Sequence, residues 1–259
     1  MAANLPVAPL AKLLLASPAM KAVILAGGKG RRLRPFSVVF PKPLAPIGDS
    51  PVLEHLIRFL VRFGVTDLVL CVDHLAELIR AFLDSRADLL RQVTIRYMRD
   101  EKPGGTAGPL AAVEGLDSTF LVANGDLVTD LDIDAMRERH RATGAMLTIA
   151  TYPMRTQLPY GLVRTDENGL VRAYEEKPTL SNEVSMGISL YEPSVLRHLK
   201  RGEYLDFPDL VRRLIGAGER VAAFPWDGYW IDIGSPDDYA RAQDDHAAGV
   251  GPWAGRGGG

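Results

Sequence analysis

An apolar run followed at once by a glycine-rich, basic loop decides how this chain begins to fold, in Lys21-Ala22-Val23-Ile24-Leu25-Ala26-Gly27-Gly28-Lys29-Gly30-Arg31-Arg32-Leu33-Arg34-Pro35. The run from Lys21 to Ala26 predicts a β-strand. The glycines after it let backbone N–H groups approach phosphate oxygens, and the arginines add positive charge. The spacing is neither that of a dinucleotide fingerprint nor that of a P-loop. The stretch therefore predicts a polyphosphate-binding loop of another type.

Strands and amphipathic helices alternate along the chain from this loop onward. The predicted strands are 68–72, 93–97, 119–123, 145–152, 161–164, 170–175, 185–191 and 220–225. The predicted helices are 54–63, 75–83, one after Thr106, 194–199, 209–215 and one opening at Ser235. Asn168-Gly169 predicts a hairpin turn. The expected fold class is α/β, with a Rossmann-like mixed sheet flanked by helices and a small β-rich annex.

Composition excludes several classes of partner. The 259 residues carry a net charge of -2, so no broad cationic field is expected for nucleic acid. No stretch reaches the roughly 20 apolar residues that span a bilayer, so no membrane partner is expected. The single cysteine, Cys71, lies in an apolar run and cannot form an internal disulfide. We therefore expect a cytoplasmic protein in which Cys71 is a core residue.

The two ends of the chain differ in composition from the rest. Residues 1–19 form a poor targeting signal and are expected to be a flexible arm or the product of a mis-assigned start. Residues 20–247 are expected to form a single domain, because no Ser- or Pro-rich linker divides them. Residues 248–259 are rich in glycine and are expected to be disordered.

Three further side chains stand in settings that favour chemistry. Lys42 lies between Pro41 and Pro43, which hold it in a restricted extended segment. Asp126 follows the strand 119–123, at the edge where open α/β sheets place ligands, although a carboxylate there can also simply cap a turn. Asp232 lies in an aromatic and apolar frame, where an unpaired buried carboxylate is costly and a metal ion would remove that cost.

Together these motifs resemble the signature of the sugar-1-phosphate nucleotidyltransferases, most closely the mannose- and heptose-1-phosphate guanylyltransferases. The motifs that carry the resemblance are residues 27–33, Pro35, Pro41-Lys42-Pro43, Pro46, Gly105-Thr106-Ala107, Gly125-Asp126, Glu176-Lys177-Pro178 and Trp230-Ile231-Asp232-Ile233-Gly234. The resemblance implies the nucleotidyltransferase fold, with the annex binding the sugar. It also implies the reaction of an NTP with a sugar 1-phosphate to give an NDP-sugar and pyrophosphate.

The resemblance further implies a role for each matching residue. Arg32, Lys42 and Lys177 would be catalytic, holding the leaving pyrophosphate, the α-phosphate and the incoming phosphate respectively. Asp126 and Asp232 would bind Mg²⁺. The implied nucleotide-binding residues are Leu25, Gly27, Gly28, Gly30, Gly105 and Thr106. The implied sugar-phosphate-binding residues are Gly161, Glu176, Lys177, Ser185 and Gly187. Relatives of this kind commonly form homo-oligomers, although the sequence itself leaves the oligomeric state open.

The substrates are less well defined than the reaction class. The run Gly105-Thr106-Ala107-Gly108-Pro109-Leu110 resembles guanylyltransferases and favours GTP, with a uridylyl- or thymidylyltransferase as the alternative. Members that act on mannose phosphate often have Asn-x-Gly where this chain has Ser185-Met186-Gly187, so the sugar stays open. An alternative function of a different class is that of a nucleotide-sugar sensor or regulatory subunit without catalytic activity. Retention of both aspartates and both proline-braced lysines argues against it.

Overall fold

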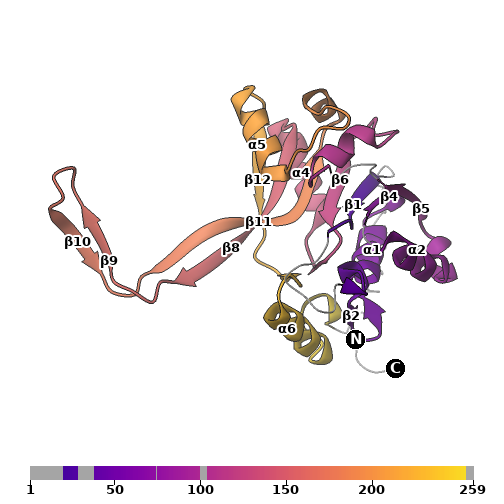
Figure 1. Cartoon of the computed structure of the whole chain (residues 1–259), viewed down its shortest axis with the longest axis horizontal. Coiled ribbons are helices and arrows are strands. Elements are labelled where there is room, and N and C mark those ends of the chain that lie inside the picture. Colours follow the sequence, from indigo (N-terminus) through magenta and orange to yellow (C-terminus); the bar gives the residue numbers. More distant parts are fainter. Residues whose placement is uncertain (1–19, 29–37, 74, 100–103, 255–259) are drawn as a thin grey trace, which may run out of the picture.

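A mixed seven-stranded sheet forms the centre of the protein in a computed structural model that describes residues 20–28, 38–73, 75–99 and 104–254 (Figure 1). The strand order is β12-β8-β11-β6-β1-β4-β5. The bounds are β1 (Met20–Leu25), β4 (Val65–Val72), β5 (Thr94–Arg99), β6 (Phe120–Asn124), β8 (Leu147–Gln157), β11 (Thr179–Tyr191) and β12 (Val221–Pro225). Strands β6, β1, β4 and β5 are parallel, whereas β11 runs antiparallel to β6 and β8. The expected α/β class with a mixed sheet is confirmed.

Helices cover both faces of the sheet because consecutive strand residues point to opposite sides. On β1, Ile24 joins the core beneath α1, whereas Val23 joins the core beneath α5. The α-helices are α1 (Val52–Arg62), α2 (Ala76–Asp84), α3 (Ala87–Leu90), α4 (Ile133–Thr143), α5 (Phe207–Gly216) and α6 (Pro236–Ala247). The short 3-10 helices are η3 (Lys42–Leu44), η4 (Gly108–Ala112), η5 (Pro193–His198) and η6 (Gly251–Trp253). None of the helices in the described part is long and apolar enough to cross a membrane.

Two helical predictions differ from the structure, and one helix was not predicted. The segments after Thr106 and at 194–199 form the 3-10 helices η4 and η5, each of which has a proline in its first turn. Helix α4 was not predicted, because its sequence is mostly polar and only a narrow stripe of it is buried. The side chain of Asp132 caps α4 by accepting a hydrogen bond from the Ala135 N–H at 2.9 Å, and Gly144 ends it in a left-handed conformation.

Two small antiparallel sheets lie beside the main one. Strands β2 (Pro46–Ile47) and β3 (Ser50–Pro51) form a tight turn before α1. Strands β7 (Leu127–Thr129) and β13 (Trp230–Asp232) pair so that Leu127 lies opposite Asp232. This second pairing joins the segment that follows β6 to the last quarter of the chain.

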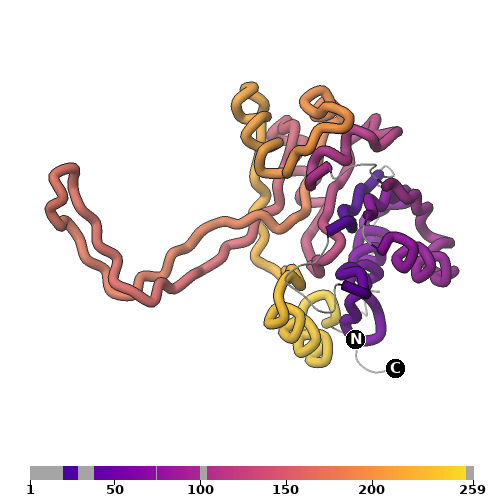
Figure 2. Tube along the Cα trace, viewed as in Figure 1, coloured from indigo at the N-terminus to yellow at the C-terminus, as the bar shows by residue number. Residues whose placement is uncertain are grey.

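The annex is a long β-ribbon that leaves the body of the protein, and we call residues 153–184 the arm (Figure 2). It comprises the outer halves of β8 and β11 and the hairpin of β9 (Leu162–Thr165) and β10 (Val171–Glu175). The predicted hairpin turn at Asn168-Gly169 is confirmed, with Gly169 at φ +79. The Asp166 carboxylate accepts hydrogen bonds from the N–H groups of Leu170 and Asn168, both at 3.0 Å. The bond from Leu170 makes the largest contribution to lowering the pKa of Asp166.

The segment after α6 includes the 3-10 helix η6, which differs from the disorder expected for residues from 248 onward. Trp253 on η6 is only 4% exposed, and its ring packs edge-on against those of His55, Tyr229 and His246. One large aromatic side chain buries enough surface to hold a glycine-rich segment in place. Residues 1–19 and 255–259 lie outside the described residues.

Candidate active site

Lys42, Asp126 and Asp232 converge at the carboxyl edge of the sheet. The Lys42 Nζ contacts Asp126 Oδ2 and donates a hydrogen bond to Asp232 Oδ1 at 3.2 Å. The Lys42 side chain is 9% exposed, against 23% for Asp126 and 34% for Asp232. Because Lys42 and Asp232 are 190 residues apart in the sequence, the fold alone brings this cluster together.

Close backbone packing holds each member of the cluster in place. Asp126 follows β6 through Gly125, whose N–H donates to the Leu25 carbonyl at 2.9 Å. A Cβ at Gly125 would lie 3.2 Å from that carbonyl oxygen, so the approach to β1 favours glycine. The Asp126 carbonyl accepts a hydrogen bond from the Ile233 N–H at 3.2 Å, which ties it to the end of β13. Lys42 is the first residue of the 3-10 helix η3, so the expectation that it lies in an extended segment is wrong; Pro43 is tolerated because the first turn of a helix does not use its N–H groups.

One carboxylate oxygen of the cluster has an unmet hydrogen-bonding capacity. Asp126 Oδ1 is buried and accepts no hydrogen bond from any described residue. Asp232, by contrast, is partly exposed and paired with Lys42, so the expectation that Asp232 is the unpaired buried carboxylate is wrong. Among the described residues, no group of three or more His, Cys, Asp or Glu side chains could hold a metal ion. A cation here would have these two carboxylates, which suits an ion that also takes phosphate and water ligands.

A cavity of about 160 Å³ opens beside Asp232. Four of the predicted binding residues line it: Leu25, Thr106, Ser185 and Gly187. Gly187 adopts φ +74, and a Cβ there would lie 2.6 Å from the Asn124 side-chain nitrogen. The structure therefore brings predicted nucleotide-binding and sugar-binding residues to the walls of one cavity.

Several lining residues were not predicted as site residues. They are Val122, Asn124, Met186, Ser189, Tyr191, Phe207 and Trp230. The Trp230 Nε1–H donates to the Met186 carbonyl at 3.0 Å, which fixes the indole at the cavity wall. Complete burial raises the pKa of the Tyr191 hydroxyl, so it stays protonated at neutral pH. Ser189 and Tyr191 could have been predicted as lining residues from their spacing. They follow Gly187 at every second position of β11, and alternate residues of a strand share one face.

The Gly105-Thr106 segment has a structural role beside its place at the cavity. The Asp206 carboxylate accepts hydrogen bonds from the backbone N–H and the hydroxyl of Thr106, at 3.1 and 3.3 Å. Gly105 at φ +78 lies against the Leu205 carbonyl, where a Cβ would lie at 2.5 Å. The Leu205 carbonyl also accepts the N–H groups of Ala107 and Gly108. These N–H groups hold the α5 entry in place, so they are not a helix N-terminus open to a ligand.

The other predicted sugar-phosphate residues lie on the arm. Gly161 faces Tyr174, since a Cβ there would lie 2.2 Å from the tyrosine hydroxyl oxygen. The Tyr174 hydroxyl donates to Glu176 Oε2 at 2.7 Å, and this bond raises the pKa of Tyr174. Lys177 is exposed and has φ +46, an unusual backbone conformation for a residue other than glycine. The structure thus groups Gly161 and Glu176 through Tyr174, but does not bring them or Lys177 to the cavity.

Part of the predicted phosphate loop falls outside the described residues. Gly27 and Gly28 follow β1 at the sheet edge, and a Cβ at Gly27 would lie 3.3 Å from the Cβ of Asp73. Gly30 and Arg32 lie outside the described residues.

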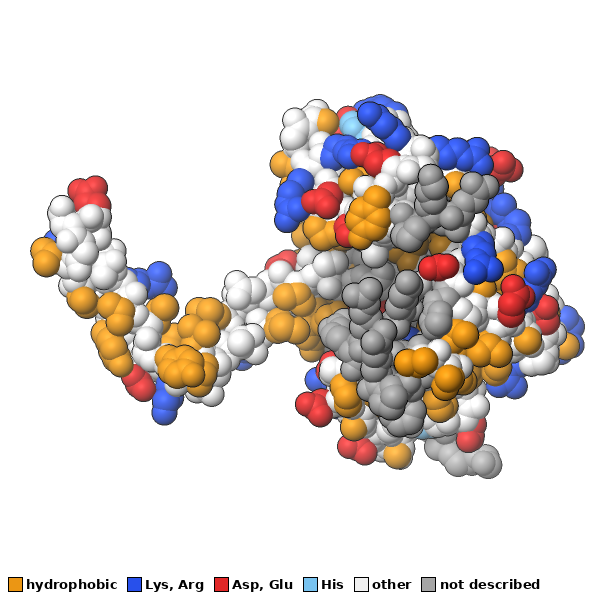
Figure 3. Space-filling view, viewed as in Figure 1, with side chains coloured by type: hydrophobic (Ala, Val, Ile, Leu, Met, Phe, Trp, Pro, Cys, Tyr) orange, Lys and Arg blue, Asp and Glu red, His pale blue; other side chains and the backbone are white. Residues whose placement is uncertain are grey.

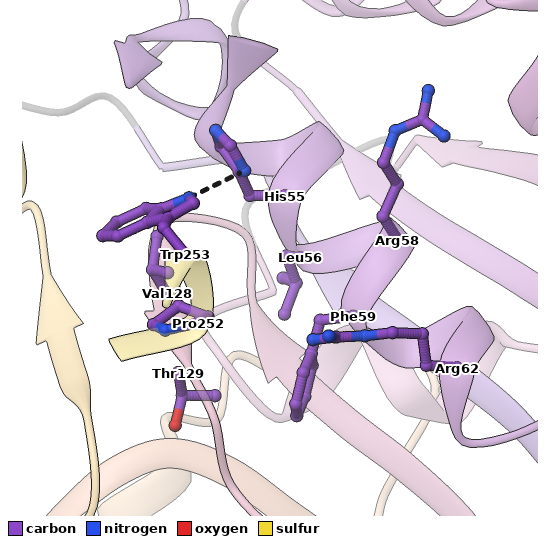
Figure 4. A pocket seen from close by; sticks show the side chains of 9 residues that line it. All are labelled: His55, Leu56, Arg58, Phe59, Arg62, Val128, Thr129, Pro252 and Trp253. Atoms are coloured by element: carbon purple, nitrogen blue, oxygen red, sulfur yellow. Dashed lines mark hydrogen bonds between the residues drawn. The ribbon is translucent and has the colours of Figure 1, made fainter. Parts of the chain in front are cut away.

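A second hollow lies beneath the ordered end of the chain (Figure 4). His55, Phe59 and Arg62 of α1 line it together with Trp253, whose Nε1–H donates to His55 Nδ1 at 3.5 Å. Its volume is about 20 Å³. Since one water already needs about 10–15 Å³ by this measure, the hollow is too small for a nucleotide or a sugar phosphate.

Comparisons with known proteins identify the family of this chain. The family model described as "Nucleotidyl transferase" matches residues 21–249. A UTP--glucose-1-phosphate uridylyltransferase of Synechocystis sp. is 35% identical over 241 residues, covering 86% of this chain and 62% of the relative. A probable mannose-1-phosphate guanylyltransferase 3 of Oryza sativa subsp. japonica is 35% identical over 228 residues, covering 85% and 63%. The chain thus spans a little under two thirds of the length of these curated relatives.

A solved structure shares the fold as well. A putative glucose-1-phosphate thymidylyltransferase from Bacillus anthracis superposes with a TM-score of 0.68 at 26% identity, over 87% of this chain and 94% of that one. The names of these three proteins indicate three different nucleotides.

Proposed function

Because this chain belongs to the nucleotidyl transferase family, we propose that it transfers a nucleotidyl group from an NTP to a sugar 1-phosphate, giving an NDP-sugar and pyrophosphate. The observation that carries the proposal is the convergence of Lys42 and Asp126 with Asp232, which lines the cavity. One cation and two carboxylates in that place suit the handling of phosphate groups and their counter-ion.

In the proposed reaction, the sugar phosphate is the nucleophile. One of its oxygens forms a bond to the α-phosphorus of the NTP while the bond to the β-phosphate oxygen breaks, and pyrophosphate leaves with that electron pair. A phosphate monoester with a second pKa of about 6 is already largely dianionic at neutral pH. No general base is therefore needed, and the protein's task is positioning and charge compensation.

Each proposed role follows the charge of the group concerned. Lys42 would hold the α-phosphate, Lys177 the incoming phosphate, and Arg32 the β- and γ-phosphates. Asp126 and Asp232 would hold Mg²⁺, and the buried Asp126 Oδ1 that accepts no hydrogen bond from a described residue fits a cation ligand. When bound, Mg²⁺ would supply charge that stabilises the reacting phosphates. The Lys42 ammonium contacts both carboxylates but offsets only one of their two negative charges, so the pair can still attract a cation.

We propose GTP as the preferred nucleotide. Leu25 and Thr106 line the cavity, whereas Gly105 and Ala107 pack against Leu205, so the space for a purine that we expected beside these two small residues is filled by the protein. The similarity to the Oryza guanylyltransferase supports this choice, whereas the Synechocystis relative favours UTP. A homo-oligomer and a cytoplasmic location complete the proposal; the latter rests on the single buried cysteine.

A competition assay tests both reaction and nucleotide. The purified protein is incubated with equimolar GTP, ATP, UTP and dTTP, Mg²⁺ and a panel of hexose and heptose 1-phosphates. The products are resolved by mass spectrometry, and pyrophosphate is measured in parallel. We expect GDP-sugar to predominate. Predominant UDP- or dTDP-sugar would overturn the nucleotide choice, and no NDP-sugar from any pair would favour the silent sensor.

A further inference from the structure

Asp73 lies directly after β4, beside the glycine segment that follows β1. In the parallel pairing of these two strands, Leu25 lies opposite Cys71, and the Ala26 N–H donates to the Cys71 carbonyl at 2.8 Å. A Cβ at Gly27 would lie 3.3 Å from the Cβ of Asp73. The neighbouring strands β1 and β4 thus bring Asp73 to the start of the predicted phosphate loop (Figure 1).

The side chain of Asp73 projects from the face of the sheet that carries the cavity. Leu25 lines the cavity and packs against the core cluster that contains Cys71. Because alternate residues of an extended segment share one face, Asp73 projects on the same side as Cys71. Two residues of a strand span about 7 Å, so Asp73 lies beyond the level of Leu25 by less than the length of a nucleotide.

The carboxylate of Asp73 has no partner among the described residues. It is partly exposed, and it makes no hydrogen bond or ion pair with any of them. Beside it, a Cβ at Gly28 would meet no described atom within 4 Å. Asp206, by contrast, already accepts hydrogen bonds from Thr106 and Tyr204. Asp73 therefore offers a carboxylate with unused acceptor capacity next to open space.

The charge of Asp73 restricts what it can bind. Two anions repel each other, so a carboxylate here opposes a phosphate. An ionised carboxylate only accepts hydrogen bonds, so its ligand must offer N–H or O–H groups. Acidic and basic side chains are interspersed over the described part of the body in Figure 3, so local contacts must orient a nucleotide there. In a nucleotide, such donors belong to the base and the ribose.

Guanine is the base whose donors match one carboxylate. Its N1–H and its 2-amino group point the same way, so they can bind both oxygens of a carboxylate at once. Uracil and thymine offer a single N3–H between two carbonyl oxygens, which a carboxylate repels. Adenine offers its 6-amino group beside an acceptor nitrogen. A carboxylate that meets this edge of the base therefore selects guanine.

We propose that Asp73 determines the choice of nucleotide by accepting hydrogen bonds from the N1–H and the 2-amino group of guanine. The base then lies beside Gly27 and Gly28, on the β4 side of Leu25, while the cavity lies on the β6 side. This inference rests on the proposed function for the presence of an NTP, but the binding of a nucleotide can be measured without turnover.

Inosine triphosphate tests the contact, because it is GTP without the 2-amino group. The affinities of GTP and inosine triphosphate are measured by isothermal titration calorimetry with Mg²⁺ present. We expect the wild type to bind GTP about 10-fold more tightly, and Asp73→Ala to bind the two nucleotides within about 2-fold of each other. Asp73→Asn keeps one acceptor oxygen and should give an intermediate ratio.

A matched control removes a carboxylate from the other end of the same strand. Asp67 on β4 is paired with Arg96 at 3.1 Å, and Asp67→Ala should keep the wild-type ratio of the two affinities. Because each ratio compares two ligands on one protein, a general loss of folded protein does not change it.

Three outcomes would overturn the assignment. They are equal affinities for GTP and inosine triphosphate in the wild type, an unchanged ratio in Asp73→Ala, and an equal weakening of GTP, ATP and UTP in that variant. The last would place Asp73 against a part that every NTP shares. A wild type that shows the expected ratios but forms no NDP-sugar would instead overturn the proposed function and support the assignment of Asp73.

Discussion

Strand β11 passes through two regions of the molecule with opposite surroundings. Near its end, Ile188 and Leu190 are fully buried in the body, whereas Leu180 at its start is 37% exposed on the arm. The body covers its apolar side chains with α-helices on both faces, and the arm has no such cover. The comparison indicates that packing within the body is sufficient to stabilise the body. The arm, by contrast, is stabilised by backbone hydrogen bonds between its strands and by any protein surface that covers it.

The largest expected effect tests the chemistry of the body. Asp232→Asn replaces a charged oxygen ligand with a neutral one, and losing the metal's charge stabilisation should lower turnover by about 10³-fold or more. The fold should persist, because Asp232 is partly exposed and its β-pairing uses the backbone. Steady-state kinetics and circular dichroism measure the two effects. Near wild-type turnover at low Mg²⁺ would contradict the metal assignment.

Next in size is the contrast in stability between body and arm. Leu190→Ala should lower the free energy of unfolding by about 2–5 kcal/mol, because it opens a cavity in the core. Leu180→Ala should change it by less than about 0.5 kcal/mol. Urea denaturation at protein concentrations that dissociate any dimer would measure both. Similar losses for the two variants would show that the arm packs as the body does.

A smaller effect separates the two proline-braced lysines. Lys177→Ala should raise the KM for the sugar phosphate by about 10- to 100-fold, as expected for one lost charged hydrogen bond. Lys42→Ala should mainly lower kcat, because charge on the α-phosphate is redistributed in the transition state. Initial rates at saturating and limiting sugar phosphate distinguish them. The reverse pattern would exchange their roles.

The smallest effect concerns the hairpin turn of the arm. Gly169 has φ +79, so Gly169→Ala should destabilise the hairpin by about 1 kcal/mol. Hydrogen exchange should accelerate for amides of β9 and β10 and stay unchanged in β1 and β6. Faster exchange throughout the protein would mean that arm and body unfold as one unit.

Sequence reasoning gave most of the sheet because its strands are apolar runs between clear turn signals. It missed α4, in which a polar sequence is held by a narrow buried stripe and a cap. It also did not predict that Trp253 is buried. The glycines around Trp253 favour disorder, but packing of its ring against residues distant in the sequence stabilises the segment. In the site, motifs predicted Lys42, Asp126 and Asp232, but residues such as Phe207 reach the cavity only through the fold. The local sequence around Lys177 also could not show that this residue lies on the arm and does not line the cavity.

The pairing of β7 with β13 has a consequence for the newly made protein. A chain emerging from the ribosome folds from its N-terminal end, and Lys42 and Asp126 appear well before Asp232. Until β13 emerges, β7 has no partner strand, and the second carboxylate of the site does not yet exist. A nascent chain therefore cannot complete its carboxylate pair before β13 has been made.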